Sequence, residues 1–273
     1  MTTIPCLPPC APDANTPTAP TPPTPPGPPE PSWQPWAAVD MVWPDQSNHH
    51  GTLFGGAALA MLDRLAFIRG SQVLRGSVVT AAVSRLDFAA PAPAGHLVEC
   101  TAHVLKQGRR SVTVATELVA EDLLSGQRTR CLSGEFVMVT QAASAPTSPP
   151  TPPADPEAPT TEPGRVRVAE IVFPGHANHR GILHGGPAMA WLAKAGFVAA
   201  TRQVRRTVVM ASSERMDFVA PARVGDVVEV LAQVSRVGRR SVHVQAELWA
   251  ESPTSGQRHL CTSAGLVYVS VDD

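Results

Sequence analysis

The stretch "NHHGTLFGGAALAMLDRLAFIRGSQVL", residues 48–74, joins an asparagine and two glycines to a long apolar segment. The segment 57–74 is apolar almost all round, which is typical of a helix buried on every side. Gly55 and Gly56 directly precede it, so no side chains shield the amide groups where the helix starts. One carboxylate, Asp63, lies inside the apolar segment. These features predict a buried helix with polar groups near its start.

Nearly the same stretch, "NHRGILHGG", recurs at residues 178–186, an offset of 130 residues. The same offset aligns "RLDFAAPA" (85–92) with "RMDFVAPA" (215–222), and it aligns two copies of "GRRSV". No gap is needed from Asn48 to Val139. Ungapped self-similarity over this length indicates a duplicated domain, so the chain is predicted to hold two fused copies of one unit.

Each copy continues with segments that alternate apolar and polar residues and are rich in β-branched side chains. In the first copy these are residues 77–88, 96–108, 110–122 and 129–140, and a short strand is predicted at 37–43. The turn signals between them are "APAPAG", "QGRR" and "LLSGQR". One buried helix with a series of long strands predicts an α+β fold for each copy.

Two segments outside the copies are dominated by Pro, Thr and Ala. They are residues 1–32 and 141–164, and such composition favours extended, disordered chain over a packed core. We therefore predict a Pro-rich tail at 1–32, a first domain at 33–140, a Pro-rich linker at 141–164 and a second domain at 165–273.

The overall composition excludes several classes of protein. A net charge of −1 gives no general attraction to nucleic acid or to an anionic membrane. The first residues lack a basic segment followed by an apolar one, so we expect no secretory signal, and no apolar run reaches the roughly 18–20 residues that would span a bilayer. The five cysteines do not form a disulfide pattern, so we expect reduced thiols and a cytoplasmic protein. His49 and His50 are adjacent and lack partners at metal-ligand spacing, so no metal site is predicted.

Asp63 lies seven residues after Gly56, which is roughly 10 Å along a helix axis. That distance separates the carboxylate from the amides of its own helix, but an antiparallel second helix would bring it to the partner's start. The position equivalent to Asp63 is Ala193, so only one site can be complete. The predicted catalytic group comprises Asp63, Asn178, His184, Gly185 and Gly186. The degenerate counterpart comprises Asn48, Gly55, Gly56 and Ala193.

Helix-start amides suit a phosphate, or a carbonyl oxygen that becomes an oxyanion. Simpler interpretations remain open: the glycines allow tight packing, Asp63 is a surface residue paired with an arginine, and His184 caps or packs against the helix.

At these residues the sequence resembles the hot-dog-fold acyl-CoA thioesterases, and in particular the tandem acyl-CoA hydrolases. The shared pattern is N-x-x-G-x-x-[HF]-G-G followed seven residues later by an acid, and "VVTAAVSRLDFAAPAPAG" and "GRRSV" are also similar. The resemblance implies two tandem hot-dog domains, each a long central helix wrapped by a curved antiparallel sheet, paired back to back. It also implies active sites at the paired interface, with the acid supplied by the other unit.

The resemblance further implies hydrolysis of acyl-CoA to free acid and coenzyme A. Asn178 and the amides of Gly185 and Gly186 would polarise the thioester carbonyl, and Asp63 would act as general base or as nucleophile. No cofactor is expected, because coenzyme A is part of the substrate. The family also suggests a homo-oligomer, commonly three double units.

Paired arginines at predicted hairpin turns suit the coenzyme A phosphates. Arg239 and Arg240 are preferred over Arg109 and Arg110, although a solvated turn explains both pairs equally well. Two other functions stay open: an enoyl-CoA hydratase-type enzyme that uses Asp63 with His184, and a non-catalytic acyl-CoA sensor or scaffold, which the alanine at 193 makes credible.

Overall fold

The computed structural model describes residues 35–84, 86–140 and 164–271, which fall within one compact unit. The predicted Pro-rich tail lies outside the described residues, and so does the predicted linker except for Gly164. The domain boundaries inferred from composition therefore stay predictions.

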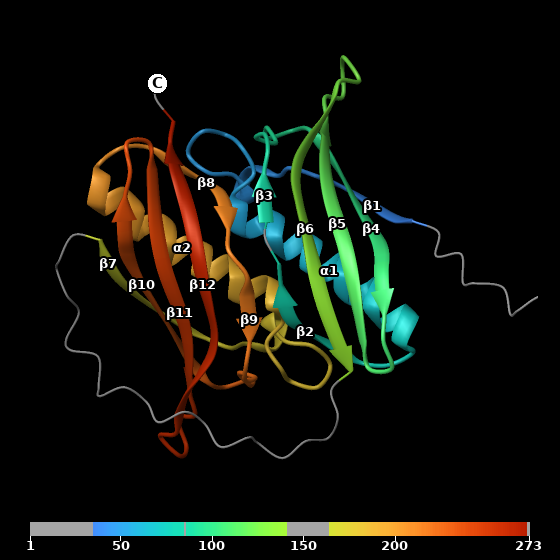
Figure 1. Cartoon of the computed structure of the whole chain (residues 1–273), viewed down its shortest axis with the longest axis vertical. Coiled ribbons are helices and arrows are strands. Elements are labelled where there is room, and N and C mark those ends of the chain that lie inside the picture. The colour runs from blue at the N-terminus through green and yellow to red at the C-terminus, as the bar shows by residue number, and fades with distance from the viewer. Residues whose placement is uncertain (1–34, 85, 141–163, 272–273) are drawn as a thin grey trace, which may run out of the picture. The chain divides into compact units, whose positions relative to one another are not determined.

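The two copies fold into the same succession of elements (Figure 1). The first copy contains β1 (Trp36–Met41), η1 (Pro44–Gln46), α1 (Gly55–Leu74), β2 (Val78–Val83), β3 (Leu86–Phe88), β4 (Leu97–Gln107), β5 (Ser111–Glu121) and β6 (Arg128–Thr140). The second contains β7 (Arg165–Ile171), η2 (Pro174–His176), α2 (Gly185–Val204), β8 (Val208–Ser213), β9 (Met216–Phe218), β10 (Val227–Val237), β11 (Ser241–Glu251) and β12 (Arg258–Ser270).

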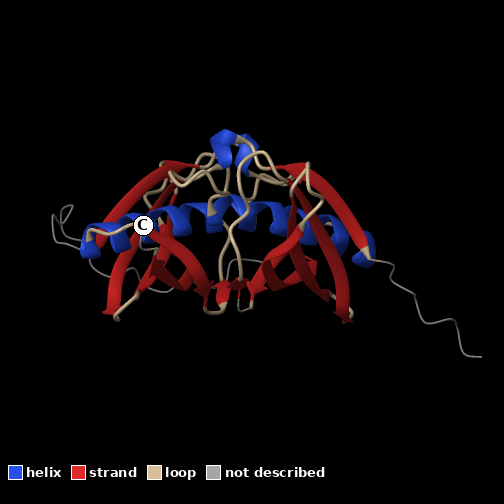
Figure 2. Ribbon diagram, turned by 90° about the horizontal axis from the view of Figure 1, so that it is seen from above, coloured by secondary structure: helices blue, strands red, loops and turns tan. Residues whose placement is uncertain are grey.

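The long helix of each copy is buried, as its composition predicts. Helix α1 starts two residues earlier than expected, so both glycines belong to its first turn, and it ends where Arg75 adopts the left-handed conformation (φ 51°). Its buried residues include Leu59, Leu62, Leu65 and Ala66. Figure 2 shows the long helices running through the middle while the strands curve round them on both sides. In the described part of the chain, none of the helices has the length and apolar character that crossing a membrane requires.

The strands join into one 12-stranded sheet. Its main order is β1-β4-β5-β6-β2-β9-β12-β11-β10-β7, and β3 and β8 lie off this path. The predicted single strand 77–88 is wrong, because the chain forms two short strands there, β2 and β3. Both pair across to the other copy: β2 pairs antiparallel with β9, and β3 with β8. Between them, the Ser84 N–H turns to donate to the Glu135 carbonyl at 2.9 Å. The sheets of the two copies are therefore continuous where the copies meet (Figure 1).

The two helices pack antiparallel at their glycines. A side-chain carbon on Gly56 would lie 2.9 Å from the Ala190 Cα, and one on Gly186 would lie 3.0 Å from the Ala60 Cα. Glycine thus permits a close backbone approach that any larger residue would block. This crossing sets the start of α2 beside the middle of α1, where Asp63 lies. The expected fold, two tandem hot-dog domains, is confirmed.

Candidate active site at the start of helix α2

Asp63 is buried between the two copies, with 1% of its surface exposed. Its Oδ2 accepts a hydrogen bond from the Gly186 backbone N–H at 2.7 Å, and its Oδ1 accepts one from the Thr80 hydroxyl at 2.6 Å. The structure therefore brings together Asp63 and the start of α2, as antiparallel helix packing predicts. The alternative of a surface aspartate paired with an arginine is wrong.

Burial raises the pKa of the Asp63 carboxyl above its ordinary value, because the charged form loses hydration. The hydrogen bonds from Thr80 and Gly186 and the nearby His184 act in the opposite direction and lower this pKa. Shifts of this kind are frequent at functional sites, so Asp63 is a candidate functional residue.

Gly185 separates Asp63 from a cavity. A side-chain carbon at this position would lie 2.7 Å from Asp63 Oδ1 and 2.8 Å from Thr80 Oγ1. Gly185 and Thr80 both line the cavity, whose volume is about 190 Å³. The carboxylate therefore lies just behind the cavity wall, next to a residue that has no side chain.

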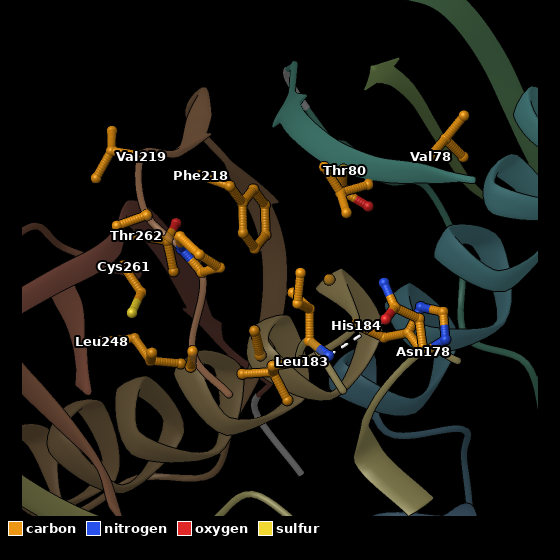
Figure 3. Close-up of a pocket in the computed structure, with 17 residues that line it drawn as sticks. Val78, Thr80, Asn178, Leu183, His184, Phe218, Val219, Leu248, Cys261 and Thr262 are labelled. Carbon is orange, nitrogen blue, oxygen red and sulfur yellow. Dashed lines mark hydrogen bonds between the residues drawn. The ribbon is translucent and has the colours of Figure 1, made fainter. Parts of the chain in front are cut away.

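The cavity has a polar end and an apolar end (Figure 3). Asn178 and His184 lie at the polar end near the start of α2, and Thr80 faces them from β2. Phe218 and Leu248 contribute to the other end. A small set of polar groups at one end of an apolar pocket is the usual arrangement of a small-molecule site.

Asn178 is held by its own loop. Its side-chain oxygen accepts hydrogen bonds from the backbone N–H groups of Arg180 at 2.9 Å and Ile182 at 3.2 Å. Because both donors meet the oxygen, the amide nitrogen faces away from the loop. This leaves Asn178, which is 8% exposed and lines the cavity, with an –NH₂ donor for a ligand oxygen.

His184 precedes α2 directly, but its side chain makes no helix-capping hydrogen bond. The ring instead packs edge-on against Phe67 of the other copy, with centroids 4.9 Å apart. Burial lowers the pKa of the imidazole, so the neutral form predominates at pH 7. The packing interpretation is thus correct for one face of the ring, while His184 also lines the cavity.

The equivalent location in the other copy lacks the acid. Ala193 lies where the first site has Asp63, and Met210 replaces Thr80. Asn48 nevertheless keeps the loop geometry, because its side-chain oxygen accepts the backbone N–H groups of His50 and Thr52. Gly55 and Gly56 form the first turn of α1. The residues predicted as a degenerate site are therefore assembled around a position that has no carboxylate.

Thr80 is a site residue that the motif analysis missed. It lies 17 residues after Asp63, on a strand, and so falls outside the pattern of asparagine, glycines and acid. The signal that would have found it is the comparison of the two copies: Asp63 and Thr80 are both replaced, by Ala193 and Met210, in the copy without an acid.

The predicted phosphate-binding arginines are not brought to the cavity. Arg109 and Arg110 lie on the exposed turn between β4 and β5, and Arg239 and Arg240 lie on the equivalent turn between β10 and β11. None of the four lines the cavity beside Asp63. Their turns are tight because Gly108 and Gly238 donate to the carbonyls of Ser111 and Ser241. The predicted role of these arginines in binding phosphate therefore stays a prediction.

Cys261 lines the cavity, but it is not an activated nucleophile. Burial and the nearby Asp226 raise the pKa of its thiol to about 12, so it stays protonated at neutral pH. Cys100, Cys131 and Cys261 are all free thiols. Within the described ranges, no group of three His, Cys, Asp or Glu side chains is arranged to hold a metal ion.

Gly185→Ala is expected to lower the free energy of unfolding by about 1–3 kcal/mol, because the new methyl group overlaps the fixed carboxylate and hydroxyl. Gly55→Ala is the matched control, since its methyl group meets Met210 at 3.3 Å, a side chain that can shift. Alanine also favours a helix over glycine by about 0.5–1 kcal/mol, so Gly55→Ala should change stability little. Urea unfolding measures both variants, and equal losses would contradict the crowding at Asp63.

Comparison with known proteins places these features in a family. Residues 50–126 and 180–257 each match the family model described as the thioesterase superfamily. Acyl-coenzyme A thioesterase 11 of Mus musculus is 24% identical over 276 residues, which cover 85% of this chain and 46% of that protein. The chain thus spans less than half the length of this curated relative.

Two solved structures extend the comparison. An acyl-CoA hydrolase from Agrobacterium tumefaciens is 42% identical, with 88% of this chain and 96% of that chain covered and a TM-score of 0.40. An acyl-ACP thioesterase from Bacteroides thetaiotaomicron is 12% identical, with 86% of this chain and 97% of that chain covered; its TM-score of 0.55 supports the fold alone. Because the family model matches once in each copy and covers more than half of the residues, the chain belongs to the thioesterase superfamily.

Proposed function

We propose that this protein hydrolyses acyl-CoA thioesters to the free acid and coenzyme A, at the site where Asp63 meets the start of α2. The observation that carries the proposal is the buried Asp63 carboxylate, held by Thr80 and Gly186 behind Gly185 at the polar end of the cavity. The names of the mouse and Agrobacterium relatives agree with thioesters of coenzyme A as the substrate class.

Asp63 acts as a general base in this proposal. The carboxylate lies behind Gly185 rather than on the cavity wall, so a water molecule is better placed than Asp63 itself to attack a thioester in the cavity. Asp63 takes a proton from this water while the water oxygen bonds to the carbonyl carbon. The C–S bond of the tetrahedral intermediate then breaks, and the proton that Asp63 took from water passes to the thiolate of coenzyme A as the free acid forms.

The carbonyl oxygen is bound by the Asn178 –NH₂ group, which its loop turns away from the backbone. A fixed donor of this kind stabilises the charge that develops on the oxygen. The Gly186 amide has a different role from the one predicted for it, since its N–H already binds Asp63. His184, in its neutral form, orients the thioester beside Asn178.

The proposal is tested with the purified chain and a panel of acyl-CoAs of increasing length, with free thiol followed over time. Release of one thiol per acyl group is expected. Hydration of an enoyl-CoA without thiol release would favour the hydratase interpretation instead. Binding of several acyl-CoAs with no reaction would favour the sensor.

Thr80→Val is expected to move the acid limb of the pH profile of kcat to higher pH. The base must be ionised, and the Thr80 hydroxyl bond lowers the pKa of Asp63. Removing the bond therefore raises that pKa further, and activity is lost at a higher pH as the solution is acidified. Steady-state rates across the acid range measure the shift.

Thr80→Ser should restore the original pH limb, because serine keeps the hydroxyl. Thr116→Val is a second control, since this buried threonine donates to the Gly134 carbonyl and not to the acid. A limb that does not move in Thr80→Val would show that Asp63 is not the titrating base.

We also propose that the protein is a homo-oligomer and that it is located in the cytoplasm. Chromatographic mass measurement of the full chain tests the first of these.

A further inference from the structure

We propose that the second pocket, at the start of α1, binds an acyl chain and does not hydrolyse it. This cavity has a volume of about 410 Å³, compared with about 190 Å³ for the cavity beside Asp63. The inference relies on the proposed function only for the chemical class of the ligand, because it concerns a separate cavity.

The second pocket keeps the walls of the first. At the offset of 130 residues, Phe88, Pro91 and Leu118 line it where Phe218, Pro221 and Leu248 line the first. Phe54 also repeats the packing of His184, since it meets Phe197 edge-on with centroids 6.4 Å apart. The cavity has therefore not been filled by larger side chains since the duplication.

The differences between the pockets remove polar groups. Ala193, Met210, Phe54 and Leu132 line the second pocket at the positions equivalent to Asp63, Thr80, His184 and Thr262. The acid and the hydroxyl that holds it are both absent, so the group that takes a proton from water in the proposed mechanism is missing here. The lost groups leave a more apolar lining, which favours a hydrocarbon chain.

Polar residues remain at the mouth of the pocket, where Asn48, His50 and Thr52 line it. Asn48 lines the pocket, and its oxygen accepts the backbone N–H groups of His50 at 2.9 Å and Thr52 at 3.3 Å. Its –NH₂ group is therefore turned away from the loop, as in Asn178. The pocket keeps a donor for an acyl carbonyl or carboxylate while it lacks the means to cleave a thioester.

The expected ligand carries an unbranched chain longer than the first cavity accepts. The second pocket extends to Tyr268, Val269 and Val271, and Tyr268 donates to the Ala193 carbonyl, so the phenol hydroxyl is already satisfied. Because Ala193 carries no charge, the carboxylate of a free acid meets no like charge there. A free long-chain acid and its coenzyme A thioester both carry such a chain and an oxygen that the Asn48 –NH₂ group can bind.

Titration calorimetry on the full chain distinguishes binding of the free acid from binding of its coenzyme A thioester. Dodecanoate is titrated into the wild-type protein, and dodecanoyl-CoA into Asp63→Asn, where it is not consumed. Ala90→Trp fills the second pocket, and Ala220→Trp makes the same change in the first, since each half-buried alanine precedes a proline of its pocket wall.

We expect Ala90→Trp to weaken dodecanoate binding about tenfold or more, and Ala220→Trp to leave it in place. With dodecanoyl-CoA, each variant should remove one of two bound equivalents if the second pocket also accepts the thioester. Ala90→Leu, a smaller change, should give an intermediate loss, and melting temperatures verify that each variant is folded. Binding of either ligand that Ala90→Trp weakens supports the proposal.

Unchanged binding of both ligands in folded Ala90→Trp would overturn the proposal. Failure of the proposed hydrolysis is seen separately, as the absence of thiol release from dodecanoyl-CoA by the wild-type chain. The two results are independent, because dodecanoate binding is measured without turnover.

Discussion

Asp63→Asn is expected to lower kcat for acyl-CoA hydrolysis by about 10²–10⁴-fold, the usual contribution of a positioned general base. The substitution preserves shape and hydrogen bonding. The new side-chain oxygen can still accept the Gly186 N–H, and the new –NH₂ group can donate to the Thr80 oxygen. Loss of turnover can therefore be attributed to the missing base. Thiol release under saturating substrate measures the effect.

Asp87→Asn is the control, because this aspartate is exposed on the neighbouring β3 and removes the same formal charge. Its turnover should remain at the wild-type level. Full activity in Asp63→Asn would exclude Asp63 as the base.

The same variant has a stability signature. The folded-state pKa of Asp63 is raised above the ordinary value of 3.8, so its favourable contribution is complete below that value and is lost as pH rises through the folded-state pKa. At pH 7 the buried acid therefore contributes less stability than a neutral side chain would, and Asp63→Asn should melt at a higher temperature than the wild type. The difference should close at a pH below 3.8. A buried acid that lowers the stability of the fold is consistent with a role in turnover.

The comparison of the two copies explains how much of the site could be predicted. Duplication supplies an internal reference, and helix geometry shows that Asp63 cannot reach the amides of its own helix. Together they predict that Asp63 lies beside the start of α2, and the hydrogen bond from the Gly186 N–H confirms this placement. The buried helices are equally accessible to prediction, because they are apolar on every side.

The remaining features depend on contacts that periodicity does not record. Thr80 reaches Asp63 only because β2 runs along the boundary between the copies and pairs with β9. The acceptor of the Gly186 amide could not be chosen from sequence, since a helix start binds a substrate oxygen and a carboxylate equally well. The role of the paired arginines stays a prediction, because duplication copies a hairpin turn as faithfully as a binding site.

Asn178→Ala is expected to lower kcat/KM by about 10²–10³-fold, as for the loss of one donor to a developing oxyanion. The alanine also removes the acceptor for the N–H groups of Arg180 and Ile182, so part of the loss could come from a disturbed loop. Asn178→Asp separates the two effects. It keeps an oxygen for the loop and replaces the –NH₂ donor with a second oxygen, so an equally large loss would exclude a disturbed loop as the cause.

Asn48→Ala is the matched control for Asn178→Ala, because Asn48 holds an equivalent loop through the N–H groups of His50 and Thr52. Its pocket contains Ala193 in place of an acid, so a much smaller decrease is expected. The opposite result, with turnover lost in Asn48→Ala and retained in Asn178→Ala, would move the active site to the start of α1. We do not expect that outcome, because the residue equivalent to Asp63 there is Ala193, whose side chain has no oxygen that could take a proton from water.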